Sequence, residues 1–173
     1  MDSKVQELLQ EIENIKKTKG RIDIVEIANS LGIKVYATNE IEQSSLIAYD
    51  SETNCYEIIF NENQPKTRQR FSIAHEIAHF LLHKDKIITF GIVGRECAVS
   101  LSLQEEKEAD NLAGMLLMPE NCIKKALEQR KLTVENVIDT EIVKSIATEF
   151  SVSLIACALR LRELGYYVGY IEV

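Results

Sequence analysis

Residues 71–80, Phe-Ser-Ile-Ala-His-Glu-Ile-Ala-His-Phe, contain the pattern His-Glu-x-x-His within an apolar run that is typical of a buried helix. Residues four apart lie on one helical face, so the imidazoles of His75 and His79 can reach one zinc ion. Glu76 lies about 100° round the helix, where its carboxylate can take a proton from water bound to that ion. A chance occurrence of the pattern is the alternative, and it is disfavoured because unpartnered polar groups are costly among apolar neighbours.

A catalytic zinc ion usually takes three protein ligands and leaves a fourth position to water or substrate. His83 is the only other histidine. It lies eight residues beyond His75, about 12 Å along a helix, so we interpret it as a residue at the helix end. Glu106 is the better candidate for the third ligand. Its neighbours Glu105 and Glu108 are expected on a solvated face.

Spacing distinguishes Glu106 from the other acidic residues near it. Asp110 follows four residues later on the same helical face, and Ala109 and Ala113 lie on that side. Their small side chains would allow this helix to approach the histidine helix closely. Asp110 is then placed to accept the second ring N–H of a ligand histidine.

The composition is that of one globular domain. The chain has 173 residues, of which 46% are hydrophobic and 27% charged, which excludes disorder and collagen. It has no apolar run of the ~20 residues that a membrane span needs, and it opens with no signal peptide, so we expect a cytoplasmic protein without a membrane contact. The four cysteines form no Cys-x-x-Cys pair and are expected to be reduced. A net charge of −7 disfavours direct binding of nucleic acid and favours protein partners with basic patches.

Periodicity and capping patterns predict an α+β fold. Helices are predicted at residues 3–20, 23–32, 65–83, 103–117 and 119–130, with two short helices within 141–164. Strands are predicted at residues 33–37, 45–50, 55–61 and 166–173, and residues 84–103 are predicted to be a mobile loop. The expected architecture is a small zincin-like domain over residues 1–173, in which a three-stranded sheet packs on the two ligand-bearing helices, followed by a helical C-terminal part and a terminal strand.

The C-terminal region 141–173 contains a subregion that resembles a helix-turn-helix. A groove-reading helix needs polar and basic residues at its exposed N-terminal end. Residues 154–159 are instead apolar on every side, so this helix is predicted to be buried in its own domain or against a partner. DNA binding is therefore disfavoured.

Two weaker signals flank the histidine helix. Lys66, Arg68 and Arg70 oppose the helix dipole at its N-terminus, and we expect them to be solvated or, alternatively, to face an acidic segment. A peptide substrate could add to the edge of strand 45–50 or 55–61. Tyr49 and Tyr56 on these strands are candidates for contacts with the oxyanion or substrate, although packing roles are favoured.

Three sequence blocks together resemble the ImmA/IrrE family of bacterial metallopeptidases over roughly residues 22–165. The blocks are residues 70–79, the segment Glu106-x-x-Ala109-Asp110-x-x-Ala113, and Leu116-Leu117-Met118-Pro119. Matched position by position, the resemblance implies that His75, His79 and Glu106 bind the metal and that Glu76 is the general base. Leu112 stands where the family usually has Phe, which keeps an apolar packing residue.

The resemblance also implies a substrate class, because members of that family cleave helix-turn-helix repressors of phages, integrative elements or stress regulons. The leading hypothesis is a gluzincin-like endopeptidase that uses Zn²⁺, or alternatively Mn²⁺, to activate water. The alternative is a non-proteolytic metal-containing module that binds and regulates such a repressor. The presence of Glu76, which binds no metal in this scheme, favours the enzyme.

Overall fold

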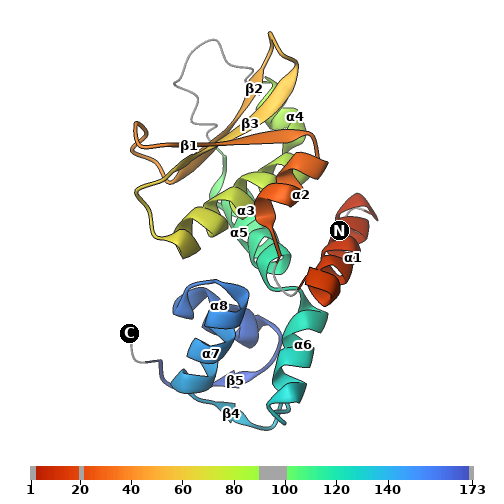
Figure 1. Ribbon diagram of the computed structural model, residues 1–173, viewed down its shortest axis with the longest axis vertical. Coiled ribbons are helices and arrows are strands. Elements are labelled where there is room, and N and C mark those ends of the chain that lie inside the picture. The colour runs from red at the N-terminus through yellow and green to blue at the C-terminus, as the bar shows by residue number, and fades with distance from the viewer. Residues whose placement is uncertain (1–2, 20–21, 90–100, 172–173) are drawn as a thin grey trace. The chain divides into compact units, whose positions relative to one another are not determined.

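The computed structural model describes residues 3–19, 22–89 and 101–171 (Figure 1). They belong to two compact units, one formed by residues 23–113 and the other by residues 1–22 together with 114–173. The predicted mixed α+β class with a three-stranded sheet is confirmed. Each unit is described separately below.

The unit of residues 23–113 is built on the three-stranded sheet. Its strands are β1 (Ile33–Thr38), β2 (Ser45–Asp50) and β3 (Cys55–Asn61), in the order β1-β3-β2. β3 is central, because it pairs in parallel with β1 and antiparallel with β2, as the predicted hairpin requires. Ile47 on β2 and Ile58 on β3 are buried at 7% and 0% exposure, so both strands turn an apolar face to the core.

The helices of this unit are α2 (Ile24–Ser30), α3 (Lys66–Leu82), α4 (Lys84–Thr89) and the greater part of α5 (Leu103–Leu117). α3 packs on β2 and β3, and its Ile73 and Ile77 are buried. Pro65 precedes α3, where its missing N–H costs no helical hydrogen bond. α5 begins with a capping box in which Ser102 and Glu105 exchange hydrogen bonds of 2.8 to 3.3 Å.

The second unit is mainly helical. It contains α1 (Ser3–Lys19), α6 (Glu120–Gln129), α7 (Thr140–Phe150) and α8 (Leu154–Glu163), with the short parallel strands β4 (Val137–Ile138) and β5 (Tyr167–Val168). α7 and α8 are bent by 102° across a three-residue turn, an angle typical of a helix-turn-helix. Within the described ranges, no single helix is long and apolar enough to cross a membrane, and only this bent pair reaches that length and composition together.

Two predictions about the fold need correction. Residues 84–89 form α4 rather than loop, because Ile87 is buried at 4% exposure and anchors this short helix; residues 90–100 lie outside the described residues. The terminal strand is limited to Tyr167–Val168, because its short partner β4 offers only two residues for pairing. The apolar helix α8 is only partly buried within the chain, since Ile155 and Leu159 are each 54% exposed, so its predicted burial against a partner stays a prediction.

Candidate metal centre

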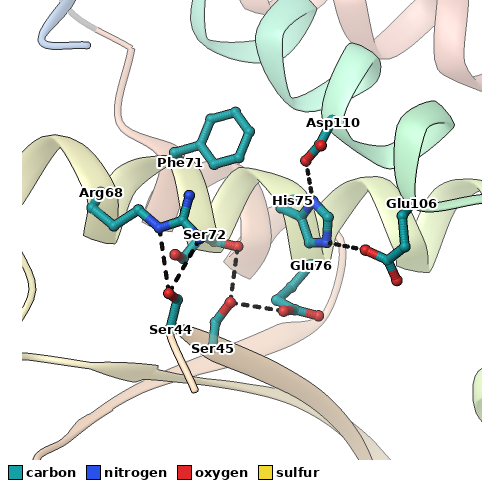
Figure 2. Close-up of a pocket in the computed structure, with 9 residues that line it drawn as sticks. All are labelled: Ser44, Ser45, Arg68, Phe71, Ser72, His75, Glu76, Glu106 and Asp110. Atoms are coloured by element: carbon teal, nitrogen blue, oxygen red, sulfur yellow. Dashed lines mark hydrogen bonds and ion pairs between the residues drawn. The ribbon is translucent and has the colours of Figure 1, made fainter. Parts of the chain in front are cut away.

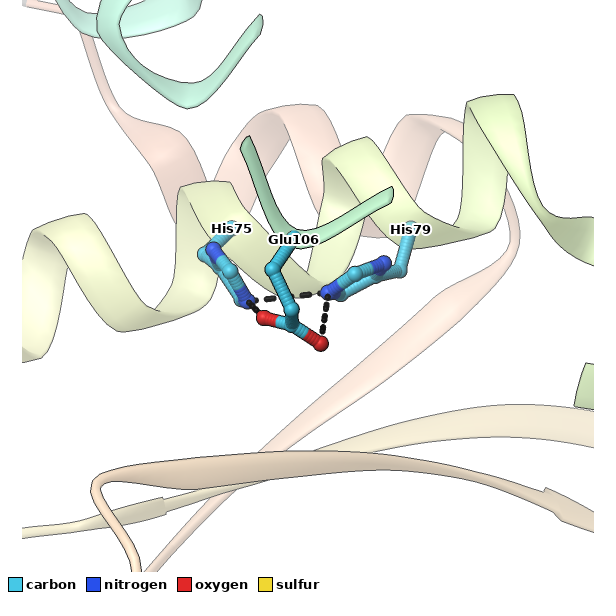
Figure 3. A group of neighbouring side chains, drawn as sticks. All are labelled: His75, His79 and Glu106. Carbon is cyan, nitrogen blue, oxygen red and sulfur yellow. Dashed lines mark hydrogen bonds and ion pairs between the residues drawn. The ribbon is translucent and has the colours of Figure 1, made fainter. Parts of the chain in front are cut away.

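Two helices supply the candidate ligands. α3 carries His75 and His79 one turn apart, and α5 carries Glu106 in its first turn (Figure 3). The Nε2 atoms of the two histidines lie 2.9 Å apart. Carboxylate oxygens of Glu106 lie 3.3 Å from Nε2 of His75 and 3.7 Å from Nε2 of His79. The structure therefore brings together all three residues that the sequence nominated.

The geometry and chemistry of this cluster fit a metal ion. One ligand atom from each residue lies within 4.8 Å of the others, so the three could hold a single ion. Donors about 2.0 Å from a tetrahedral zinc ion lie roughly 3.3 Å from one another, and the observed separations of 2.9 to 3.7 Å lie on either side of that value. Two imidazoles and one carboxylate are a donor set that zinc accepts.

The second ring nitrogens of both histidines have partners. Nδ1 of His75 lies 2.9 Å from Oδ1 of Asp110, which follows Glu106 by one turn of α5. Nδ1 of His79 lies 3.1 Å from Nδ1 of His83, at the end of α3. Such contacts fix the ring orientation and the tautomer, leaving Nε2 free for an ion.

The environment of His79 keeps its ring neutral. Desolvation by burial, followed by the neighbouring His75 and His83, lowers the pKa of His79 to about 3. A neutral imidazole has the lone pair that a metal ion needs. At neutral pH no proton has to leave this residue before an ion binds.

Glu76 lies beside the cluster and is buried at 7% exposure. Burial raises the pKa of its carboxyl group, whereas a hydrogen bond from Ser45 and the nearby His75 lower it. The Ser45 hydroxyl donates to Oε1 of Glu76 over 2.7 Å (Figure 2). A buried carboxylate with a raised pKa suits a general base that works near neutral pH.

A cavity of about 470 Å³ opens onto these groups (Figure 2). Its walls include His75, Glu76, Glu106 and Asp110 at one end, and the side chain of Arg68 at the other. The candidate base Glu76 and two of the candidate ligands, His75 and Glu106, therefore line one cavity, as a hydrolytic site requires.

The two candidate tyrosines lie outside the walls of this cavity. The Tyr49 hydroxyl donates to Oδ1 of Asn54 in the hairpin turn. The Tyr56 ring packs edge-on against Phe80 with 4.8 Å between centroids, and its hydroxyl has no hydrogen-bond partner among the described residues. Burial raises the pKa of Tyr56. Both tyrosines therefore have packing contacts, which is the role the sequence favoured.

Sequence reasoning missed three residues that support the site. Ser45 donates a hydrogen bond to the candidate base Glu76, and neither periodicity nor spacing could connect the two, because they lie on a strand and a helix far apart in the chain. His83 follows His79 by four residues, a spacing that would have predicted their contact. Glu108 is exposed, as expected, and its Oε2 also lies 3.5 Å from Nε2 of His83.

Two predictions of solvated residues are wrong. Glu105 contacts Lys86 and caps α5, and these hydrogen bonds lower the pKa of its carboxyl group to about 2. Arg70 is buried at 9% exposure, whereas Lys66 and Arg68 are exposed as expected. The cap explains Glu105, and Arg70 lies on the side of α3 that carries buried residues.

Comparisons with known proteins agree with the site. The family model described as the IrrE N-terminal-like domain, a peptidase family, matches residues 28–162. Metallopeptidase ImmA of Bacillus subtilis (strain 168) is 28% identical over 145 residues, which is 83% of this chain and 83% of that protein.

A solved structure shares the fold. It is a Mycobacterium tuberculosis transcriptional regulator with a TM-score of 0.55 and 16% sequence identity. The match covers 90% of this chain and 46% of the regulator, so the chain spans less than half the length of that structure. Since the family model covers most of the chain, including the His-Glu-x-x-His helix and Glu106, the chain belongs to the ImmA/IrrE family of metallopeptidases.

Proposed function

We propose that this protein is a gluzincin-like endopeptidase with a zincin-like fold, loaded with zinc or manganese, that cleaves a helix-turn-helix repressor in the cytoplasm. The observation that carries the proposal is the position of Glu76. Its buried carboxylate lies beside the His-His-Glu cluster and is held by Ser45 without belonging to the cluster. A site that only bound metal would have no use for a carboxylate there.

Each residue then has a distinct role. His75, His79 and Glu106 would hold the ion, which when bound polarises the scissile carbonyl and activates a water molecule. Glu76 accepts the proton of that water and later donates it to the leaving amine. Ser45 keeps Oε1 of Glu76 in place for both transfers. Asp110 and His83 hold the remote nitrogens of the two histidines.

The outer edge of β2, which pairs with no other strand in the described part of the chain, is suited to hold an extended peptide. β3 is paired on both sides, so it is excluded from strand addition, whereas β2 is an edge strand that begins at Ser45 beside the base. Main-chain hydrogen bonds to β2 would place a peptide bond over the cavity without requiring a particular sequence. Specificity must then come from side-chain contacts.

A repressor substrate is supported by the family and by charge. The family resemblance implies this substrate class, and a net charge of −7 favours a partner with the basic surface of a DNA-binding protein. The proposed peptidase domain extends over residues 1–173, because the family match at 28–162 includes residues of both compact units.

The test is to incubate the zinc- or manganese-loaded protein with the product of the adjacent helix-turn-helix repressor gene and to identify fragments by mass spectrometry. We expect one or a few cuts in the repressor. Glu76→Gln should bind zinc with unchanged affinity but cleave at least ~10²-fold more slowly, since the variant loses the proton acceptor. Glu52→Gln, at an exposed position in the hairpin turn, is the matched control and should cleave normally.

Two results would contradict the proposal. Full activity in Glu76→Gln would remove the proposed base. Metal-dependent binding of the repressor by the wild-type protein, with no cleavage under any metal, would instead support the non-proteolytic regulatory module.

A further inference from the structure

The cavity has an unassigned end, two helical turns from the candidate base. It is formed by Arg68 in the first turn of α3, the Phe71 ring, and the hydroxyl groups of Ser44 and Ser72 (Figure 2). Arg68 is a positive charge at the positive end of the helix dipole, so it does not stabilise α3 and its presence there is not explained by helix formation. We propose that this end is a subsite for a carboxylate of the bound peptide, with Arg68 as the recognising group; the inference rests on the proposed peptidase function.

Arg68 is held in place at the cavity wall. Its Nε and Nη2 atoms donate to Oγ of Ser44 over 3.3 and 3.2 Å, and Cζ lies 5.7 Å from the centroid of the Phe71 ring. Within residues 3–19, 22–89 and 101–171, no carboxylate lies within ion-pair distance of this guanidinium group. A positioned arginine with an unmatched charge is suited to bind a planar carboxylate through two hydrogen bonds.

Ser72 gives a second and independent indication of a polar ligand. Its side chain is buried at 3% exposure and lines the cavity, yet its Oγ has no hydrogen-bond partner among the described residues. A buried hydroxyl group without a partner costs free energy. Because this Oγ is itself almost fully covered, an oxygen of a bound carboxylate would accept the hydrogen bond once the Ser72 hydroxyl turns toward the cavity.

The spacing along α3 places the subsite close to the reacting bond. Arg68, Ser72 and Glu76 follow one another at four-residue intervals, so they lie along one helical face. Arg68 is about 12 Å from Glu76 along the helix axis. An extended peptide rises about 3.4 Å per residue, so the recognised carboxylate should lie about three to four residues from the scissile bond.

The acidic groups of the site do not prevent this recognition. Glu76, Glu106 and Asp110 lie at the opposite end of the cavity. The distance along α3 between Arg68 and Glu76 is comparable to the screening length of about 8 to 10 Å at physiological ionic strength. A bound divalent ion would further offset their charge.

The test uses small metal-binding probes and needs no knowledge of the natural substrate. Three straight-chain hydroxamates of equal length, ending in a carboxylate, a primary amide or an ammonium group, are titrated calorimetrically into the zinc-loaded protein, over a series of chain lengths. At the chain length that spans the cavity, the carboxylate should bind about tenfold more tightly than the amide. Arg68→Ala should abolish this preference, and Arg68→Glu should favour the ammonium compound.

Lys66 provides matched controls, because it is basic, exposed and in the same turn of α3, but does not line the cavity. Lys66→Ala and Lys66→Glu should retain the preference for the carboxylate. All four variants should melt at temperatures close to the wild type, since both positions are exposed. Peptide hydroxamates with the carboxylate either on an internal Asp or Glu side chain or at the chain terminus then distinguish its two sources.

The possible failures are distinguishable. Equal affinities for carboxylate and amide at every chain length, or a preference that survives in Arg68→Ala, would overturn the subsite while leaving the metal site intact. If none of the hydroxamates bound in a zinc-dependent way, the proposed function would fail, and the subsite with it.

Discussion

The Nδ1 atoms of His79 and His83 lie 3.1 Å apart, and Nε2 of His83 in turn lies 3.5 Å from Oε2 of Glu108. If His79 binds an ion through Nε2, its proton must be on Nδ1, so His83 has to accept that hydrogen bond. The proton of His83 is then on Nε2, directed at Glu108. One arrangement of protons thus satisfies both contacts in the row of His79, His83 and Glu108, and it orients His79 toward the ion.

Replacing His83 should therefore weaken metal binding. His83→Leu removes the acceptor for the Nδ1 proton of His79, and the zinc dissociation constant should rise about 10- to 100-fold. The measurement is competition with a chromophoric chelator. His83→Asn should retain most of the affinity, because its side-chain oxygen can replace Nδ1. Equal losses in the two variants would show that His83 acts only through packing.

Replacing Asp110 should also weaken metal binding, because Asp110 contacts the other candidate histidine ligand, His75. Asp110→Ala removes the partner of Nδ1 in His75, which lies 2.9 Å away, and should weaken zinc binding about 10- to 100-fold. Asn111→Ala, at the exposed neighbouring position on α5, serves as control. Undiminished affinity in Asp110→Ala would exclude an orienting role for this carboxylate.

Ser45→Ala should move the pH profile of cleavage. The Ser45 hydroxyl lowers the pKa of Glu76 against the larger effect of burial, so its loss raises that pKa. The base is active when deprotonated, and the acidic limb of kcat/KM should therefore shift to higher pH. Ser45→Thr keeps a hydroxyl group and should restore the profile. A uniform loss of rate without a shift would contradict this role.

The metal-free protein should lose stability in acid because of His79. Its pKa is lowered to about 3 in the folded state, so between its ordinary value of 6.5 and about 3 the unfolded chain binds the proton more readily. Stability from His79 is thus present above pH 6.5 and lost as pH falls toward 3. Urea unfolding in the presence of a chelator measures this slope, which should be shallower in His79→Leu.

Glu76 has the opposite effect on how the stability of the metal-free protein depends on pH. Burial raises its pKa in the folded state, so the folded protein binds this proton more readily, and stability decreases as pH rises above the ordinary value of 4.5. Glu76→Gln should accordingly stabilise the metal-free protein at neutral pH and make its loss of stability in acid steeper. A destabilised Glu76→Gln at neutral pH would contradict this assignment.

The features predicted correctly from sequence are those with a local repeat. The His-Glu-x-x-His spacing and the interval from Glu106 to Asp110 are set by one helical turn, so they could be read without coordinates. The hairpin of β2 and β3 follows from two β-rich runs around a short polar turn. These patterns place the candidate ligands and the candidate base on their elements.

The features that could not be predicted depend on partners distant in the chain. β4 has two residues and no periodicity, and exists only because Tyr167 and Val168 pair with it. The contact of Ser45 with Glu76 depends on how β2 packs against α3. The burial of Arg70 was missed because a charge near a helix start usually indicates solvent, and only the fold shows which side of α3 faces the core.

The position of Glu106 in the first turn of α5 has a consequence for observing the site. The leading amides of a helix lack intrahelical acceptors and exchange their hydrogens readily when the end frays. An ion bound by Glu106 and the histidines of α3 would hold this turn against α3. Deuterium uptake in the first turn of α5 should therefore slow when the metal binds. This slower exchange would measure how much of the metal site is occupied, which tryptophan fluorescence cannot do because the chain has no tryptophan.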